Sequence, residues 1–346
     1  YAPRPVDAGK SGVARDIPSY TKERQGIFMK KHRKSKWKKI CAAAIAVMII
    51  AAGMKISSSV PQIPFFTESG KSLSSGSDVL PEGSVNLKKL NSPYAVLMDV
   101  ESGNVLAKQK STARIYPASL TKIMTAIVAI EHTDKMGEKT TVPSDIFSSL
   151  YAEDASLAGF QPGEEVTWKD LLYGILLPSG AECCLTFAEH IAGSEKAFVD
   201  MMNEKAEELG MRDTHFSNVT GLQDKKHYST VEDMAVLLRY ALKNETFRQA
   251  FTARRYSVPP TNEHPEGFTF YNTMFQAMDN AGISDDNILG GKTGYTEKAG
   301  LCLASLAEIN GREYILVTPK ADGNHYTEPY HVIDAENVYE QIRQVM

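Results

Sequence analysis

Ser119 and Lys122 are the pair of residues in this chain with the clearest potential for nucleophilic catalysis. The apolar residues 123–130 that follow them predict a buried helix. Helical positions three apart share a face, so Lys122 would project beside Ser119. Burial lowers the pKa of a lysine toward that of a useful base, and a serine hydroxyl needs such a neighbour to become a nucleophile. The helix N-terminus also offers N–H groups to a developing oxyanion.

The same spacing also fits a purely structural pair. Ser119 is then the N-cap of the helix, and Lys122 extends along apolar surface toward solvent. Ser35 and Lys38 have the same spacing inside a basic segment that has no apolar surroundings for an active site. The pair therefore needs support from other parts of the chain.

Two later motifs supply residue types that complement this pair. Ser179-Gly180-Ala181 follows the apolar residues 171–177, and Lys292-Thr293-Gly294 precedes a predicted strand. A lysine and a threonine together offer a cation and a hydroxyl to a carboxylate. Each motif alone is equally compatible with a polar turn.

Strand patterns at the two ends of the chain and helical patterns between them predict how these motifs are positioned. Residues 94–99 and 105–107 form one predicted hairpin, and residues 301–309 and 313–317 form another around Asn310-Gly311. Further helices are predicted at 171–177, 183–192, 196–209, 230–242 (after a variant capping box at Thr230) and 335–345, and a loop with a short strand at 263–273. Hairpins predict an antiparallel sheet covered by helices, an α+β architecture. Since both ends must join one sheet, the Lys292 strand should lie near the Ser119 helix.

The order and wide spacing of the three motifs fit the signature set S-x-x-K, S-D-N and K-T-G of class A β-lactamases and penicillin-binding proteins. Over residues 84–346 the chain resembles a serine-type D-alanyl-D-alanine carboxypeptidase, a low-molecular-mass penicillin-binding protein of Gram-positive type. The matching stretches are 116–122 (YPASLTK), 171–180 (LLYGILLPSG), 210–211 (GM), 215–222 (HFSNVTGL), 227–230 (HYST) and 290–296 (GGKTGYT). The resemblance implies a β-lactamase/transpeptidase-like fold with a helical middle region.

The resemblance also implies roles for individual residues. Ser119 is expected to be the acylated nucleophile, Lys122 its general base, and Ser179 a proton relay to the leaving amine. The substrate-binding residues are expected to be Lys292, Thr293, Gly294 and Tyr295. Lys292 and Thr293 would hold the terminal carboxylate, and the amides of Ser119 and Tyr295 would form the oxyanion hole. The implied substrate is a peptidoglycan stem peptide ending in D-Ala-D-Ala, the implied inhibitors are β-lactams, and no cofactor is implied.

Ala181 departs from the family pattern, because the third position of the middle motif is usually asparagine. If Ala181 flanks the cleft, it removes a hydrogen bond to the substrate and to Lys122. Two alternatives therefore stay open beside the carboxypeptidase: a β-lactamase of the same fold, and a weakened pseudo-enzyme that only binds cell-wall peptide. No glutamate segment typical of a β-lactamase deacylation site is evident in the sequence.

The N-terminal region predicts a membrane location. Residues 1–39 hold 12 Lys and Arg against 3 Asp and Glu, and residues 40–346 hold 26 against 39. The uncharged run 40–54 is about 22 Å long as a helix, short of a hydrocarbon core of about 30 Å. We expect a basic cytoplasmic tail (1–39), a membrane anchor or a cleaved signal segment (40–56), a linker (57–83) and an extracytoplasmic domain (84–346). This topology assigns the basic residues to the cytoplasmic membrane and not to nucleic acid.

The cysteines and histidines indicate neither a disulfide framework nor a metal site. Cys41 falls in the apolar run, Cys183 and Cys184 are adjacent, and Cys302 is distant from both. We expect Cys183, Cys184 and Cys302 to be buried thiols. The eight histidines contain no H-x-x-x-H pair, so the sequence predicts no zinc peptidase.

Overall fold

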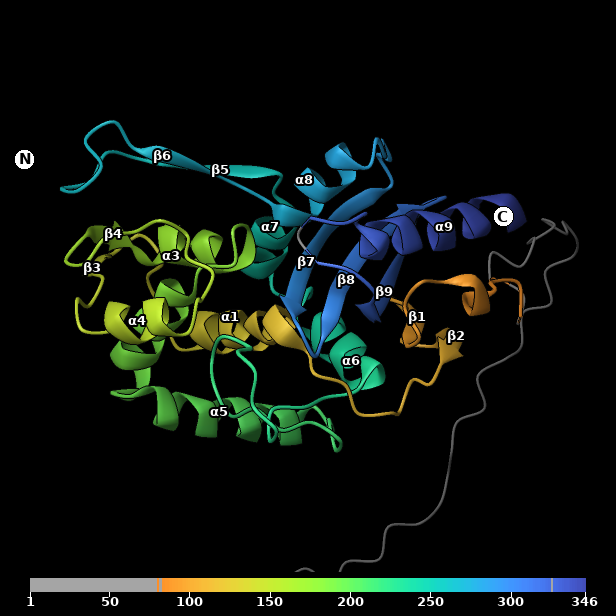
Figure 1. The fold of residues 1–346 in the computed structure, drawn as a ribbon, viewed down its shortest axis with the longest axis horizontal. Helices are drawn as coiled ribbons and strands as arrows, with labels where there is room; N and C mark the ends of the chain where they lie inside the picture. The colour runs from red at the N-terminus through yellow and green to blue at the C-terminus, as the bar shows by residue number, and fades with distance from the viewer. Residues whose placement is uncertain (1–79, 81–82, 325) are drawn as a thin grey trace, which may run out of the picture. The chain divides into compact units, whose positions relative to one another are not determined.

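A five-stranded antiparallel sheet organises the domain, in the order β2-β1-β9-β8-β7 (Figure 1). The computed structural model describes residues 80, 83–324 and 326–346. The strands are β1 (Ala95–Asp99), β2 (Val105–Gln109), β7 (Ile288–Thr296), β8 (Gly300–Ile309) and β9 (Arg312–Ala321). Val96 of β1 pairs with Val317 of β9, so the two ends of the domain join in one sheet, as predicted.

The hairpin between β8 and β9 forms at the predicted dipeptide. Asn310 and Gly311 have φ values of +52° and +75°, and Ile309 pairs with Arg312 across the turn. A two-residue turn with both central φ values positive matches the twist of the flanking strands, and asparagine and glycine adopt it most readily.

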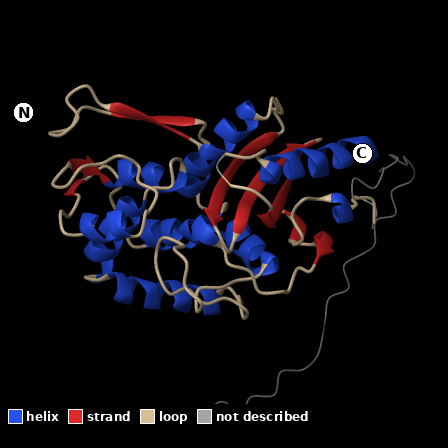
Figure 2. Ribbon diagram, viewed as in Figure 1, coloured by secondary structure: helices blue, strands red, loops and turns tan. Residues whose placement is uncertain are grey.

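The sheet is covered on both faces, and alternate side chains along a strand enter different hydrophobic cores. Val96 and Met98 of β1 belong to one hydrophobic core, while Ala95 and Leu97 belong to the other. The first core contains α1 and α6, and the second contains α8 and α9 (Figure 2). Strands with both faces buried lack a polar side, which is why β1 is buried at all five positions.

Helices and two small hairpins fill the middle of the chain. The helices are η1 (Leu87–Lys89), η2 (Ala118–Thr121), α1 (Lys122–Glu131), α2 (Phe147–Ala152), α3 (Trp168–Leu176), α4 (Ala181–Ala192), α5 (Glu195–Glu208), α6 (Val231–Ala241), α7 (Glu245–Thr252), α8 (Thr273–Asn280) and α9 (Tyr330–Val345). The hairpins pair β3 (Lys139–Thr141) with β4 (Glu165–Thr167) and β5 (Arg255–Val258) with β6 (Phe268–Tyr271). These elements confirm the predicted α+β fold with a helical middle.

One predicted helix start differs from the structure, and a second is confirmed with only half of its predicted capping. Ser119 is not an N-cap: it lies inside the short 3-10 helix η2, whose N-cap is Pro117. Thr230 does cap α6, since its hydroxyl accepts the N–H of Asp233 at 3.1 Å. The reciprocal half of that capping box is absent, because the Asp233 carboxylate accepts the Thr214 hydroxyl at 2.7 Å instead.

The predictions for residues 1–39, for the apolar segment 40–56 and for most of the linker 57–83 lie outside the described residues. Within the described part of the chain, none of the helices combines the length and apolar character that crossing a bilayer requires. Cys183, Cys184 and Cys302 are buried free thiols, as predicted.

Candidate active site

Ser119 and Lys122 lie within hydrogen-bonding distance at the junction of η2 and α1. The Lys122 ammonium nitrogen, Nζ, is 3.1 Å from Ser119 Oγ and donates to the Thr220 carbonyl at 2.8 Å. The lysine is only 2% exposed, and burial lowers its pKa below the ordinary value. A buried lysine beside a serine hydroxyl is a competent base–nucleophile pair, so the predicted juxtaposition is confirmed.

The backbone around the serine is held in an unusual conformation. Ala118, directly before Ser119, has a φ of +48°, which a residue with a side chain rarely adopts. Gly221 packs against the Ala118 carbonyl so closely that a Cβ at that position would collide with it. Packing of the 215–222 segment therefore fixes the turn that presents Ser119.

Behind this turn lies a buried histidine that the sequence reasoning did not single out. His227 Nε2 is 2.7 Å from the Thr121 hydroxyl, and the Ser217 N–H donates to Nδ1 at 3.1 Å. Because Nδ1 accepts a hydrogen bond, the ring proton lies on Nε2 and donates to Thr121. Burial lowers the pKa of His227 to about 4, so the imidazole is neutral and anchors η2.

Ser179 lies between α3 and α4 in a strained conformation. Its φ is +72°, its side chain is 6% exposed, and its hydroxyl has no hydrogen-bond partner among the described residues. The adjacent Glu182 is buried and accepts the N–H groups of Ala158 and Gly159 at 2.7 and 2.9 Å. A buried, unpartnered hydroxyl is costly unless a ligand or reacting group uses it.

Ala181 does not flank the cleft, contrary to the expectation from the family pattern. It begins α4, is fully buried, and does not line the cavity beside Ser119. Its N–H donates to the Ser156 carbonyl at 2.8 Å. Its position at the start of a helix explains the difference, because the side chain turns into the core.

Strand β7 brings the third motif against the serine. A Cβ on Gly294 would be 2.9 Å from the Ser119 amide nitrogen, so glycine is needed for the two backbones to approach. The Thr293 hydroxyl is 2.6 Å from the hydroxyl of Thr273 at the start of α8. Among the described strands, β7 lies at one edge of the sheet and pairs with β8.

Lys292 lies behind the cavity wall and not on it. Its side chain is fully buried, and Nζ donates to the Thr293 carbonyl at 2.8 Å. Burial and the nearby Lys122 ammonium lower the pKa of Lys292 well below its ordinary value. Two ammonium groups in one desolvated site repel each other, so protonation of one lysine disfavours protonation of the other.

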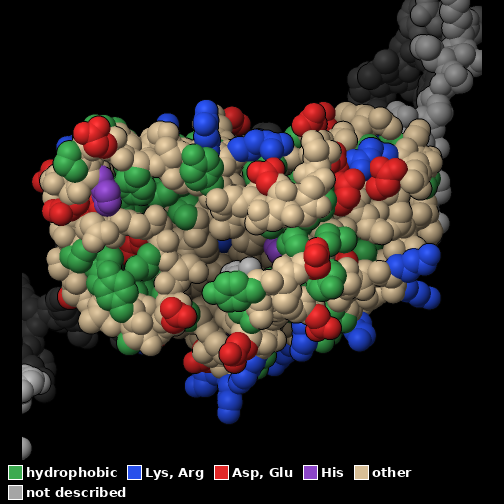
Figure 3. Space-filling view, turned by 45° about the horizontal axis from the view of Figure 1, so that its top comes forward, with side chains coloured by type: hydrophobic (Ala, Val, Ile, Leu, Met, Phe, Trp, Pro, Cys, Tyr) green, Lys and Arg blue, Asp and Glu red, His purple; other side chains and the backbone are tan. Residues whose placement is uncertain are grey.

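A cavity of about 290 Å³ lies in front of these groups. Ser119, Ser179, Thr293, Gly294 and Tyr295 all line it, and the two buried lysines, Lys122 and Lys292, are the predicted site residues that do not. The face drawn in Figure 3 is hollowed near its centre. Thr273 and His331 also line it, and no local sequence signal marks either residue.

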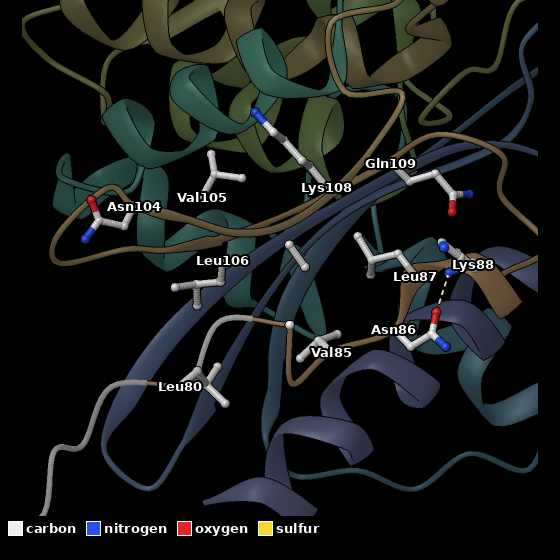
Figure 4. A pocket seen from close by; sticks show the side chains of 12 residues that line it. Leu80, Val85, Asn86, Leu87, Lys88, Asn104, Val105, Leu106, Lys108 and Gln109 are labelled. Carbon is white, nitrogen blue, oxygen red and sulfur yellow. Dashed lines mark hydrogen bonds between the residues drawn. The ribbon is translucent and has the colours of Figure 1, made fainter.

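A larger cavity, of about 1040 Å³, lies elsewhere. It is a groove along η1 and β2 lined by Leu80, Val85, Leu87 and Leu106, with Lys88 and Lys108 near it (Figure 4). β2 and β7 are at opposite edges of the sheet, about 19 Å apart at roughly 4.8 Å per strand. The groove holds no base beside a nucleophile, so we assign the site to the smaller cavity.

The described residues contain no group of three or more His, Cys, Asp or Glu arranged to hold a metal ion. The side chains at the site are a serine hydroxyl beside a buried lysine, a second serine hydroxyl and two threonine hydroxyls.

Comparison with known proteins agrees with this geometry. Residues 82–323 match peptidase family S11, described as D-alanyl-D-alanine carboxypeptidase. The chain is 38% identical over 235 residues to the D-alanyl-D-alanine carboxypeptidase DacF of Bacillus subtilis. The aligned region covers 65% of this chain and 58% of DacF. It is 35% identical over 221 residues to the D-alanyl-D-alanine carboxypeptidase DacA of Escherichia coli, and the aligned region covers 61% of this chain and 52% of DacA.

Solved structures show the same fold. The Streptomyces K15 DD-transpeptidase superposes with a TM-score of 0.68 at 26% identity, over 75% of this chain and 99% of that chain. A D-alanyl-D-alanine carboxypeptidase of Mycobacterium tuberculosis gives 0.63 at 27% identity, over 76% and 95%. The chain spans little more than half the length of the two curated relatives.

Proposed function

Because this chain belongs to the D-alanyl-D-alanine carboxypeptidase family, peptidase family S11, we propose that it removes the terminal D-Ala from peptidoglycan stem peptides ending in D-Ala-D-Ala. The observation that carries the proposal is the 3.1 Å approach of Lys122 Nζ to Ser119 Oγ at the wall of a cavity beside an edge strand. A peptide can add to the free edge of β7 by main-chain hydrogen bonds, which orients its scissile bond.

Acylation begins at Ser119. Neutral Lys122 takes the hydroxyl proton as Oγ attacks the carbonyl of the scissile bond. The N–H groups of Ser119 and Tyr295 stabilise the oxyanion of the tetrahedral intermediate. The C–N bond then breaks, and the proton passes through Ser179 to the leaving D-Ala amine. Water then attacks the Ser119 ester as Lys122 accepts its proton. The acyl C–O bond breaks, Lys122 returns the proton to Ser119 Oγ, and the shortened peptide leaves with a new carboxylate.

The two buried lysines differ in their protonation state when substrate is bound. The substrate's terminal carboxylate, held by the hydroxyls of Thr273 and Thr293, favours the ammonium form of Lys292 directly behind them. That positive charge disfavours protonation of Lys122, whose pKa burial already lowers. Substrate binding therefore leaves Lys122 as the neutral base that acylation needs.

β-Lactams should acylate the same serine, because they present a strained carbonyl and a carboxylate in the same arrangement. Their ring-opened product stays attached to the Ser119 ester, so they act as covalent inhibitors.

We also propose that the apolar segment 40–56 holds the domain at the outer face of the cytoplasmic membrane. The basic cluster that precedes it supports this orientation, since positive residues stay on the cytoplasmic side.

The test of the activity is release of D-Ala from a peptide ending in D-Ala-D-Ala, measured with the wild-type domain and with Ser119→Ala and Ser179→Ala. We expect release by the wild type and none by Ser119→Ala. Hydrolysis of penicillin without D-Ala release would assign a β-lactamase, and stoichiometric peptide binding without turnover would assign a pseudo-enzyme. Either result would overturn the proposal.

A further inference from the structure

The groove along η1 and β2 lies at the edge of the sheet opposite the active site. Leu80, Val85 and Leu106 contribute apolar side chains to its walls (Figure 4). Val105, which also lines it, is 38% exposed, and few large apolar side chains of the described residues are left so open to solvent. The proposed reaction uses none of these residues, so the groove needs a separate explanation.

The two chain segments that form this groove carry positive charge and no negative charge. Residues 83–92 and 104–110 together contain four lysines and no Asp or Glu, although residues 40–346 as a whole hold 39 acidic residues against 26 basic ones. All four side chains are exposed. They are Lys88, Lys89, Lys108 and Lys110. We call these four lysines and the groove the basic face.

The acidic residues next to the basic face are already paired. Lys108 lies 3.6 Å from Glu232, a long contact that leaves the lysine side chain 64% exposed. On α9, whose Gln341 accepts the Asn86 N–H, Glu336 and Glu340 are both ion-paired with Arg343. The basic face therefore presents a net positive charge to solvent, and its natural partner is an extended anionic surface.

The position of the groove along the chain indicates which anionic surface it meets. Leu80, the first described residue, lines the groove, so the chain enters the domain there. Residues 57–79, 23 in number, connect Leu80 to the apolar segment 40–56, for which a membrane location is proposed above. A chain of 23 residues spans at most about 80 Å when fully extended and about 26 Å as a random coil. With the proposed anchor in the bilayer, a tether of that length keeps the local concentration of lipid at the groove high.

We infer that the basic face binds the anionic phospholipid headgroups of the membrane that anchors the domain, with Val105 at the contact. The inference rests on the proposed membrane location and is independent of the proposed reaction. Each lysine near an anionic bilayer surface strengthens binding by about fivefold, and the attraction falls off within a Debye length. Four lysines around a small apolar patch therefore give a weak, salt-sensitive contact that the tether makes effective.

This contact would orient the catalytic cleft. β2 and β7 are at opposite edges of the sheet, about 19 Å apart. A domain that rests on its β2 edge holds Ser119, which packs against β7, on the side away from the lipid. The cleft then faces the cell-wall peptide and not the bilayer.

The experiment measures whether the domain stays on vesicles after its tether is cut. A protease recognition sequence is inserted between Gly76 and Ser77 of the full chain, which is then reconstituted into phosphatidylglycerol/phosphatidylcholine vesicles or into phosphatidylcholine vesicles alone. After cleavage, the vesicles are sedimented and the released domain is titrated with fresh vesicles. We expect the cut domain to stay with the anionic vesicles at low salt, to leave them at about 0.5 M salt, and to leave the neutral vesicles at both.

Two double variants with the same change in charge locate the contact. Lys88→Gln with Lys108→Gln should weaken binding of the cut domain to anionic vesicles by about 25-fold, at fivefold per lysine. Lys139→Gln with Lys196→Gln removes two exposed lysines on β3 and α5, outside the basic face, and should keep binding within about twofold. Melting temperatures equal to that of the wild type show that the variants are folded.

The possible results separate this inference from the anchor on which it rests. If the uncut chain stays with neutral vesicles and the cut wild-type domain leaves anionic vesicles at low salt, the anchor holds and the inference is overturned. If the uncut chain leaves neutral vesicles, the anchor fails, and the titration of the cut domain still measures the basic face. Equal binding to neutral and anionic vesicles, or equal weakening by the two double variants, would also overturn the inference.

Discussion

Gly294→Ala should impair acylation without unfolding the domain. The new methyl group would be 2.9 Å from the Ser119 amide nitrogen, 3.2 Å from the Ala118 Cβ and 3.3 Å from the Leu120 amide nitrogen. The two amide nitrogens belong to the backbone of η2, so these neighbours cannot rotate away as a side chain would. The nucleophile must therefore move relative to β7.

The size of the effect follows from that displacement. Relief of these contacts requires a shift of roughly 0.5 Å, and a misplacement of about 1 Å costs about a hundredfold in rate. We therefore expect acylation to slow by about tenfold, which corresponds to about 1.4 kcal/mol of transition-state stabilisation.

The assay is the second-order rate constant for acylation by a fluorescent penicillin, with the melting temperature measured in parallel. Gly137→Ala is the matched control, since a Cβ there meets no atom within 4 Å and adds the same methyl group. Acylation by Gly294→Ala within about twofold of the control would refute the argument that β7 and η2 must be in backbone contact.

Three further predictions follow from the same structure. Because burial lowers the pKa of Lys122, the acylation rate should fall as the pH drops below that lowered pKa. Lys122→Arg, whose side chain is always charged, should abolish acylation at every pH. A pH series of adduct formation tests both points, and acylation of Lys122→Arg would contradict them. The pKa of His227 is about 4 in the folded state against an ordinary 6.5, so the unfolded state binds more protons between pH 4 and pH 6.5. The free energy of unfolding should therefore fall by about 3 kcal/mol as the pH is lowered from 6.5 to 4. Urea titrations should show that the free energy of unfolding of His227→Gln depends less on pH over this range. In cells, the domain should sediment with membranes and be digested by external protease, while N-terminal sequencing that begins after residue 53 or 59 would show a cleaved signal segment instead.

The sequence predicted the elements whose signals are local. Runs of apolar residues placed β1 and β8, the Asn310-Gly311 pair placed the turn between β8 and β9, and the uncharged run after Lys122 placed α1. The Ser119–Lys122 contact also follows from local spacing, because a 3-10 turn leading into an α-helix still brings positions three apart together.

Features that depend on distant segments were missed. The positive φ of Ala118 is imposed by Gly221 and Gly294, which lie 103 and 176 residues further along the chain. The buried position of Ala181 depends on the Ser156 carbonyl, which no local pattern marks. The active-site cavity is assembled from segments that lie far apart in the chain, so its lining is invisible to any single stretch of sequence.

The most direct test of the central claim is the site of β-lactam attachment. After incubation with penicillin and digestion with trypsin, the adduct should map to the peptide 115–122, which contains Ser119. Ser119→Ala should carry no adduct while keeping the wild-type melting temperature. An adduct on any other residue, or labelling that persists in Ser119→Ala, would contradict the assignment of Ser119 as the nucleophile.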